Sequence, residues 1–162
     1  MIVFIFASAF ILDQITKGIV RHTMVLGESI PILGDVVRFT YVENPGMAFG
    51  IRIQHGYIFT ILSILASLGV LIYLLIHKDE GMLLKGSLAC ILGGAAGNLI
   101  DRVLHQQVVD FLDIGFGRVR WPVFNIADSA VVIGMLILCF HVFIKKEPSQ
   151  ESKPLKSSDN AQ

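Results

Sequence analysis

Four long apolar runs constrain the fold of this chain more than any other feature of its sequence. They occupy residues 2–20, 57–77, 86–104 and 123–144. A helix needs roughly 20 mostly apolar residues to cross the hydrocarbon core of a bilayer, and each run is about that long. Charged residues make up only 16% of the chain, against about 25% in a soluble domain. We therefore predict an all-α membrane protein, with four transmembrane helices in one membrane-embedded domain, residues 1–144.

The segments outside the runs predict the rest of the architecture. Residues 34–56 contain VVRFTYV followed by Asn-Pro-Gly. This pattern of β-branched and aromatic residues before a turn predicts a small extramembrane β element between the first and second helices. No basic segment precedes the first run, so we expect a retained span rather than a cleaved leader. The polar tail 145–162 is predicted to be disordered and cytoplasmic.

Four spans place both termini on the same side of the membrane. Six lysines lie on that side, four in the tail and two in the loop between the second and third spans, whereas five arginines lie in the opposite loops. Because lysine and arginine concentrate in cytoplasmic loops, we expect both termini in the cytoplasm. The net charge of the chain is zero, which gives no support for a nucleic-acid partner.

Nearly all ionisable and amide side chains of the spans lie close to one end of the predicted bundle. The first and third spans lead outward and the fourth leads back inward, so their polar ends meet at one interface. His141 is the exception within the spans. The convergence holds whichever way the bundle is oriented. The converging residues are Asp13, Lys17, Asn98, Asp101, Arg102, Asn125 and Asp128, with Asp110 in the short connection just outside.

Two of these carboxylates, Asp110 and Asp128, are our candidates for catalysis. A carboxylate inside a membrane helix costs about 2.5–3.5 kcal/mol on insertion scales, so Asp128 needs a compensating role. Two carboxylates that face each other in a low-dielectric site share one proton, and the pair can act as general acid and general base. The sequence contains neither the GxSxG of a serine hydrolase nor the HExxH of a zinc protease.

Other interpretations remain open at this stage. Asp13 and Lys17 are four residues apart, so they fit a purely structural ion pair as well as a functional one. For Asp101, an interfacial charge that snorkels toward water is favoured over catalysis. A proton-coupled transporter also holds carboxylates in its helices, but it usually places them near the midplane. An assembly protein that uses the aspartates as packing contacts is a further alternative.

Five short blocks make the chain resemble the lipoprotein signal peptidases, also called signal peptidase II, over most of its length from Asp13 to Val131. Their order along the chain is the order found in that family. The blocks are DQITK (Asp13–Lys17), ENPGMAFG (Glu43–Gly50), GGAAGNLIDRV (Gly93–Val103), VVDF (Val108–Phe111) and FNIADS (Phe124–Ser129).

The resemblance implies an aspartyl endopeptidase of the bacterial inner membrane whose active site lies at the outer face. Such enzymes remove the signal peptide of prolipoproteins before a lipid-modified cysteine, need no metal or other cofactor, and are inhibited by globomycin. The resemblance places the catalytic pair on Asp110 and Asp128, and we expect the turn Asn44–Gly50 to act as a lid with Gly46 and Gly50 as hinges. The positions that it implies for substrate binding or support of the pair are Asp13, Lys17, Asn44, Gly94, Asn98, Arg102, Asn125 and Ala127.

Overall fold

The computed structural model describes residues 1–48, 51–52 and 57–145. The predicted hinge Gly50 and the tail from residue 146 onward lie outside these residues. The helices are α1 (Ile2–Thr23), α2 (Tyr57–Ile76), α3 (Met82–His105) and α4 (Ile126–Lys145). The strands are β1 (Ser29–Leu33), β2 (Val37–Asn44), β3 (Met47–Ala48), β4 (Ile51–Arg52), β5 (Val108–Phe116) and β6 (Val119–Arg120).

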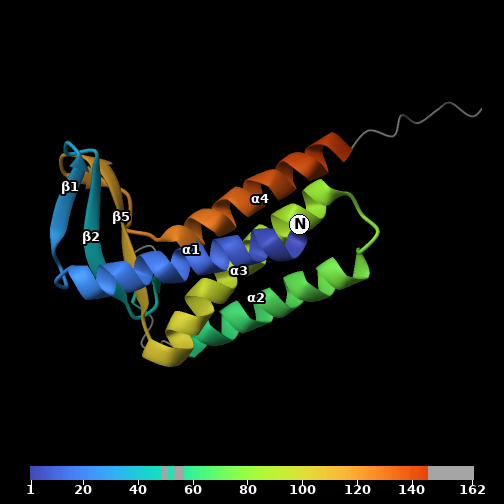
Figure 1. Ribbon diagram of the computed structural model, residues 1–162, viewed down its shortest axis with the longest axis horizontal. Coiled ribbons are helices and arrows are strands. Elements are labelled where there is room, and N and C mark those ends of the chain that lie inside the picture. The colour runs from blue at the N-terminus through green and yellow to red at the C-terminus, as the bar shows by residue number, and fades with distance from the viewer. Residues whose placement is uncertain (49–50, 53–56, 146–162) are drawn as a thin grey trace, which may run out of the picture.

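Helix α3 packs against the other three helices (Figure 1). Small residues allow this close approach, because a side chain on α3 would collide with its neighbours. A Cβ atom added at Gly93 would lie 2.7 Å from the carbonyl oxygen of Phe6 on α1. A Cβ atom at Gly94 would meet the carbonyl oxygen of Ala127 on α4. Backbones that approach this closely are typical of helix packing in membranes, where burial of apolar surface supplies no driving force between helices.

Three helices in the described part of the chain are long and apolar enough to cross a membrane: α1, α3 and residues Ile126–Ile144 of α4. Helix α2 contributes a shorter apolar stretch, Thr60–Ile76. The fourth transmembrane span therefore stays a prediction. None of the described side chains of α2 is buried, and this helix packs mainly against α3.

An antiparallel sheet of order β1-β2-β5-β6 lies at the end of the bundle where α1 ends and α4 begins (Figure 1). Strands β1 and β2 confirm the β element predicted between the first two spans. The sheet is larger than predicted, because β5 and β6 come from the connection between α3 and α4. Strand β5 pairs along β2 and covers an edge that would otherwise be unpaired.

A small hydrophobic core joins the sheet to the end of α1. Val20 of α1, Tyr41 of β2, and Val109 and Phe111 of β5 are all buried in it. The rings of Phe111 and Phe39 meet edge to face, with centroids 5.9 Å apart. This core holds the first residues of β5 against the bundle, and Asp110 lies between its two β5 members.

Candidate active site

Strand β5 carries Asp110 into the interior, where its side chain is only 4% exposed. Asp110 lies opposite Val42 of β2, next to a register shift between Phe39 and Val42. A bulge of this kind bends a strand and redirects its side chains. Asn44 at the end of β2 donates a hydrogen bond of 3.1 Å from Nδ2 to Asp110 Oδ2.

The chain ahead of α4 is tied to β5, which places the start of α4 beside Asp110. Phe124 forms an isolated bridge with Leu112, and its carbonyl oxygen accepts the backbone N–H groups of Phe111 and Leu112 at 3.0 and 2.7 Å. Asn125, the next residue, is therefore held against β5.

Asn125 and Asp128 form a reciprocal cap at the start of α4. The backbone N–H of Asp128 donates to Asn125 Oδ1 at 2.9 Å, and the backbone N–H of Asn125 donates to Asp128 Oδ2 at 3.2 Å. This is the geometry of a capping box, in which side chains three residues apart satisfy backbone donors at a helix N-terminus. The spacing Asn-x-x-Asp thus explains both where α4 begins and where the Asp128 carboxylate lies.

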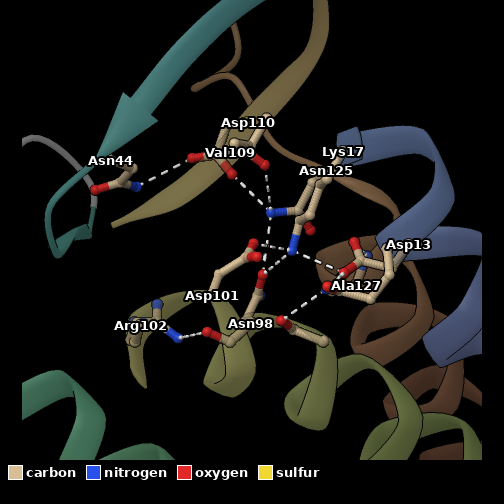
Figure 2. Close-up of polar contacts among 12 residues, drawn as sticks. Asp13, Lys17, Asn44, Asn98, Asp101, Arg102, Val109, Asp110, Asn125 and Ala127 are labelled. Carbon is tan, nitrogen blue, oxygen red and sulfur yellow. Dashed lines mark hydrogen bonds and ion pairs between the residues drawn. The ribbon is translucent and has the colours of Figure 1, made fainter. Parts of the chain in front are cut away.

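The buried amide of Asn125 contacts the carboxylate of Asp110 (Figure 2) and the backbone of Asp128. Its Nδ2 atom donates to Asp110 Oδ1 at 2.7 Å, and lies 3.1 Å from Asn98 Oδ1 and 3.3 Å from the carbonyl oxygen of Val109. Its Oδ1 atom accepts from the backbone of Asp128. One fully buried side chain therefore contacts Asp110 on a strand and Asp128 on a helix.

Asn98 of α3 supports Asp128 from the opposite side. Its Nδ2 atom donates to Asp128 Oδ1 at 2.7 Å, while its Oδ1 atom accepts from Lys17 Nζ at 2.8 Å. A lysine ammonium can only donate, so the oxygen of Asn98 must face Lys17 and its NH₂ group must face Asp128. Lys17 thereby fixes the amide orientation that the Asp128 carboxylate requires.

Lys17 is almost fully buried and is paired with two carboxylates (Figure 2). Its Nζ atom lies 2.7 Å from Asp13 Oδ2 and 2.9 Å from Asp101 Oδ2. Arg21 approaches Asp101 at 3.5 Å, so two cations balance two carboxylates. The interpretation of Asp101 as a snorkelling interfacial charge is wrong, because its side chain is 1% exposed and held by a lysine from another helix.

Asp13 links this charge cluster to the start of α4. Its Oδ1 atom accepts the backbone N–H of Ala127 at 2.8 Å. Gln14 donates to Asp13 Oδ2 and to the carbonyl oxygen of Gly97, both at 3.1 Å. Gln14 was not among the predicted site residues, because in the sequence it is only a polar residue in an apolar run. Gly94 lies against Ala127 and provides space rather than a hydrogen bond.

A hollow of about 450 Å³ opens from Asp128 into the space between α2, α3 and α4. Arg102 lines it, and its Nη1 atom makes long hydrogen bonds of 3.4 Å to the carbonyl oxygen of Asn98 and 3.5 Å to Ser63 Oγ. The structure thus brings all the predicted site residues into one region: Asp13, Lys17, Asn44, Gly94, Asn98, Arg102, Asp110, Asn125, Ala127 and Asp128.

Burial changes the proton affinity of Asp110. Removal from water, reinforced by the negative charge of Asp128, raises the pKa of this carboxyl from 3.8 to about 6. Hydrogen bonds from Asn44 and Asn125 and the charge of Lys17 act in the opposite direction, but they do not cancel the effect of burial. Asp110 therefore holds a proton well above the pH at which an exposed aspartate loses it, as a general acid must.

Within residues 1–48, 51–52 and 57–145, no group of three or more His, Cys, Asp or Glu side chains could hold a metal ion.

Comparison with known proteins shows the family to which this chain belongs. The sequence model of the family described as signal peptidase (SPase) II matches residues 5–144. The lipoprotein signal peptidase of Desulforapulum autotrophicum is 42% identical over 142 residues, which cover 85% of this chain and 88% of the relative. The lipoprotein signal peptidase of Geobacillus thermodenitrificans is 38% identical over 151 residues, which cover 93% and 94% of the two chains.

Two solved structures of bacterial membrane enzymes have the same fold as this chain. One described as a bacterial membrane enzyme, determined by the in meso method, superposes with a TM-score of 0.83 at 31% identity and covers 94% of this chain and 93% of its own. A second with the same description has a TM-score of 0.77 at 33% identity. Together with the membrane-length helices, these similarities identify a bacterial membrane protease. The chain belongs to the signal peptidase II family.

Proposed function

We propose that this protein is an aspartic endopeptidase that removes the signal peptide from diacylglyceryl-modified prolipoproteins and cleaves just before the lipidated cysteine. Asp110 and Asp128 are the catalytic residues. The observation that carries the proposal is the buried amide of Asn125, which contacts both carboxyl-bearing residues where water is largely excluded. Paired carboxyls in such a site share a proton and divide the roles of acid and base.

The division of roles follows from the surroundings of the two carboxyls. Asp110 is the acid in its protonated form, which its surroundings favour because burial raises its pKa to about 6. Asp128 acts as the base and takes a proton from water, whose oxygen forms a bond to the scissile carbonyl carbon while Asp110 gives its proton to the carbonyl oxygen. When the tetrahedral intermediate collapses, the C–N bond breaks, Asp128 returns its proton to the leaving amine of the cysteine, and Asp110 takes a proton back from one of the two hydroxyl groups.

The surrounding residues keep the two carboxyls in place. Asn98 and Asn125 donate to Asp128 and Asp110, and Lys17 fixes Asn98. Asp13 supports the first turn of α4 through the backbone of Ala127. Arg102 lies at the rim, where a guanidinium group can bind a substrate carbonyl. Asn44, at the edge of the turn proposed as a lid, contacts Asp110 directly.

The proposed topology has four spans, both termini in the cytoplasm and the catalytic pair at the outer face of the bacterial inner membrane. A lipidated cysteine anchored in the outer leaflet then brings the scissile bond to the level of the pair. Globomycin, the inhibitor implied by the family, should occupy the same site. A transporter is disfavoured, because the described polar cluster is confined to the end of the bundle next to the sheet (Figures 1 and 2).

Cleavage of a diacylglyceryl-modified lipobox peptide by the purified protein in detergent tests this proposal. Wild type should cleave in the presence of chelator and be blocked by globomycin, whereas Asp110→Asn and Asp128→Asn should each be inactive. Asp79→Asn is the matched control, because this exposed carboxylate lies in the loop at the opposite end of the bundle. Activity that survives in Asp110→Asn or in Asp128→Asn would assign the chemistry to another carboxylate. A folded wild type without activity would favour the transporter or assembly interpretations.

A further inference from the structure

A second hollow lies against Asp128, on the other side of the helix ridge from the first. It has a volume of about 380 Å³ and is formed by the start of α4 and the segment before it. The two hollows share Asp128 and Val132, which are one helical turn apart on α4. The side chains that line the second hollow are Trp121, Phe124, Asp128, Ser129, Val132 and Ile133.

The two hollows differ in the groups that they offer. The first is lined by Ser63, Ser67, Asn98 and Arg102 as well as by apolar side chains. Ser67 Oγ and Arg102 Nε are buried there without a hydrogen-bond partner among the described residues. In the second hollow, the Ser129 hydroxyl already donates to the carbonyl oxygen of Asn125 at 2.9 Å. Apart from Asp128, Ser129 and the indole N–H of Trp121, its lining is hydrocarbon and aromatic.

This difference matches the two sides of a lipidated cleavage site. A peptide bond must be extended for a nucleophile to attack it, so the residues before it lose their helical hydrogen bonds. Inside a membrane those carbonyl groups need donors from the protein, and Ser63, Ser67 and Arg102 supply such donors in the first hollow. The cysteine after the scissile bond carries hydrocarbon chains, which need space and no donors.

We propose that the Asp128–Val132 ridge divides the site into a peptide side and a lipid side. The signal peptide occupies the hollow between α2, α3 and α4, and the acyl chains of the S-linked diacylglyceryl group pass through the hollow between Trp121 and Ile133. This assignment rests on the proposed function. The lipid side selects by shape, because lipid tails are as apolar as the groove and transfer between them supplies little energy. The chains instead set the position of the scissile carbonyl over Asp128.

The test measures kcat/KM on two lipobox peptides, whose cysteine carries a dipalmitoylglyceryl or a dibutyrylglyceryl group. Ile133→Trp fills the lipid side and should lower kcat/KM for the dipalmitoyl substrate by roughly 10- to 100-fold, since a displaced reacting group loses rate on that scale. The dibutyryl substrate, whose chains fit the remaining space, should change by less than about threefold. Leu136→Trp is the matched control, because this exposed residue of α4 lines neither hollow. It should affect neither substrate.

Two further variants keep the test decisive. Ala66→Trp fills the peptide side and should lower kcat/KM for both substrates equally. Trp121→Ala removes a wall of the lipid side at an exposed side chain, and it should repeat the selective loss if Ile133→Trp does not fold. Equal losses on both substrates in the lipid-side variants, no loss in either, or chain selectivity in Ala66→Trp would refute the assignment alone. A folded wild type that cleaves neither substrate would refute the proposed function and the assignment with it.

Discussion

Replacement of Asp110 by asparagine should remove activity and, at neutral pH, stabilise the fold. The carboxyl is 4% exposed and its pKa is raised from 3.8 to about 6, mainly by burial and then by Asp128. The folded state therefore binds the proton more tightly than the unfolded state. Stability contributed by this proton is present at low pH and is lost as the pH rises between those two values.

The size of the effect follows from the two pKa values. Linkage gives a destabilisation from Asp110 ionisation of about 0.5 kcal/mol at pH 4, about 1.6 kcal/mol at pH 5 and about 3 kcal/mol at pH 7. Asparagine keeps the shape but has no titrating proton and only one acceptor oxygen. One of the hydrogen bonds from Asn44 and Asn125 is therefore lost, and this loss is the same at every pH. The stability of Asp110→Asn relative to wild type should thus rise by about 2.5 kcal/mol from pH 4 to pH 7. For a chain of this size that corresponds to a relative gain in Tm of roughly 5–10 °C.

Thermal unfolding in detergent, followed by intrinsic fluorescence at pH 4, 5, 6 and 7, measures this difference directly. Asp113→Asn is the matched control, since Asp113 is also buried in β5 but accepts from Arg120 Nε at 2.5 Å and from Thr40 Oγ1 at 2.8 Å. Its replacement removes the charge partner of Arg120 and should destabilise the fold at neutral pH. A Tm difference between Asp110→Asn and wild type that stays constant from pH 4 to pH 7 would refute the reasoning.

Three other substitutions test the support of the site. Lys17→Met leaves the buried carboxylate of Asp13 without a cation and that of Asp101 with Arg21 alone, and should destabilise the protein by about 3–5 kcal/mol, seen as a lower Tm. Gly94→Ala places a methyl group against the carbonyl oxygen of Ala127 and should cost about 1–3 kcal/mol, whereas Gly69→Ala, with open space around the added atom, should not destabilise. Asn125→Ala should lower kcat by about a hundredfold with a smaller effect on KM, because it misplaces the reacting groups rather than the bound peptide. An equal change in both constants would contradict that last role.

The apolar runs predicted the helices to within a few residues, and the deviation at the start of α4 has a local cause. The predicted span began at Val123, but the helix begins at Ile126 because Asn125 caps it. The spacing Asn-x-x-Asp at Asn125 and Asp128 fits a capping box, which places the start of the helix just after Asn125.

Strand β5 was not predicted, because the residues Val108–Phe111 are all buried and show no alternation of polar and apolar side chains. Its two carboxylates, Asp110 and Asp113, are three residues apart and so do not follow the period of two that marks a strand. Its pairing with β2 also joins segments more than sixty residues apart, as in the partnership of Glu43 with Val109. Nothing local in the sequence encodes such a contact.

The buried charge cluster could also be predicted only in part, because some of its contacts join different helices. The ion pair of Asp13 and Lys17 could be predicted from their i, i+4 spacing on one helix, and the structure contains it. Its third member, Asp101, comes from another helix, and only the packing of α1 on α3 brings it to the lysine. Without that packing, an aspartate near the end of a span resembles an ordinary interfacial charge.

The two walls of the hollow between α2, α3 and α4 differ in how many buried contacts hold them in place, and this difference suits the proposed reaction. On one wall, Lys17, Asn98 and Asn125 join α1, α3, α4 and β5 through buried polar contacts, which break with a large penalty and so favour one arrangement of the carboxyls. The other wall is α2, which has no buried side chain among those described and packs mainly against α3. Cleavage needs a rigid pair of carboxyls, whereas signal peptides of different sequence need an adaptable wall. The division of the bundle into a fixed side and a loosely packed side therefore allows one catalytic geometry to act on many substrates.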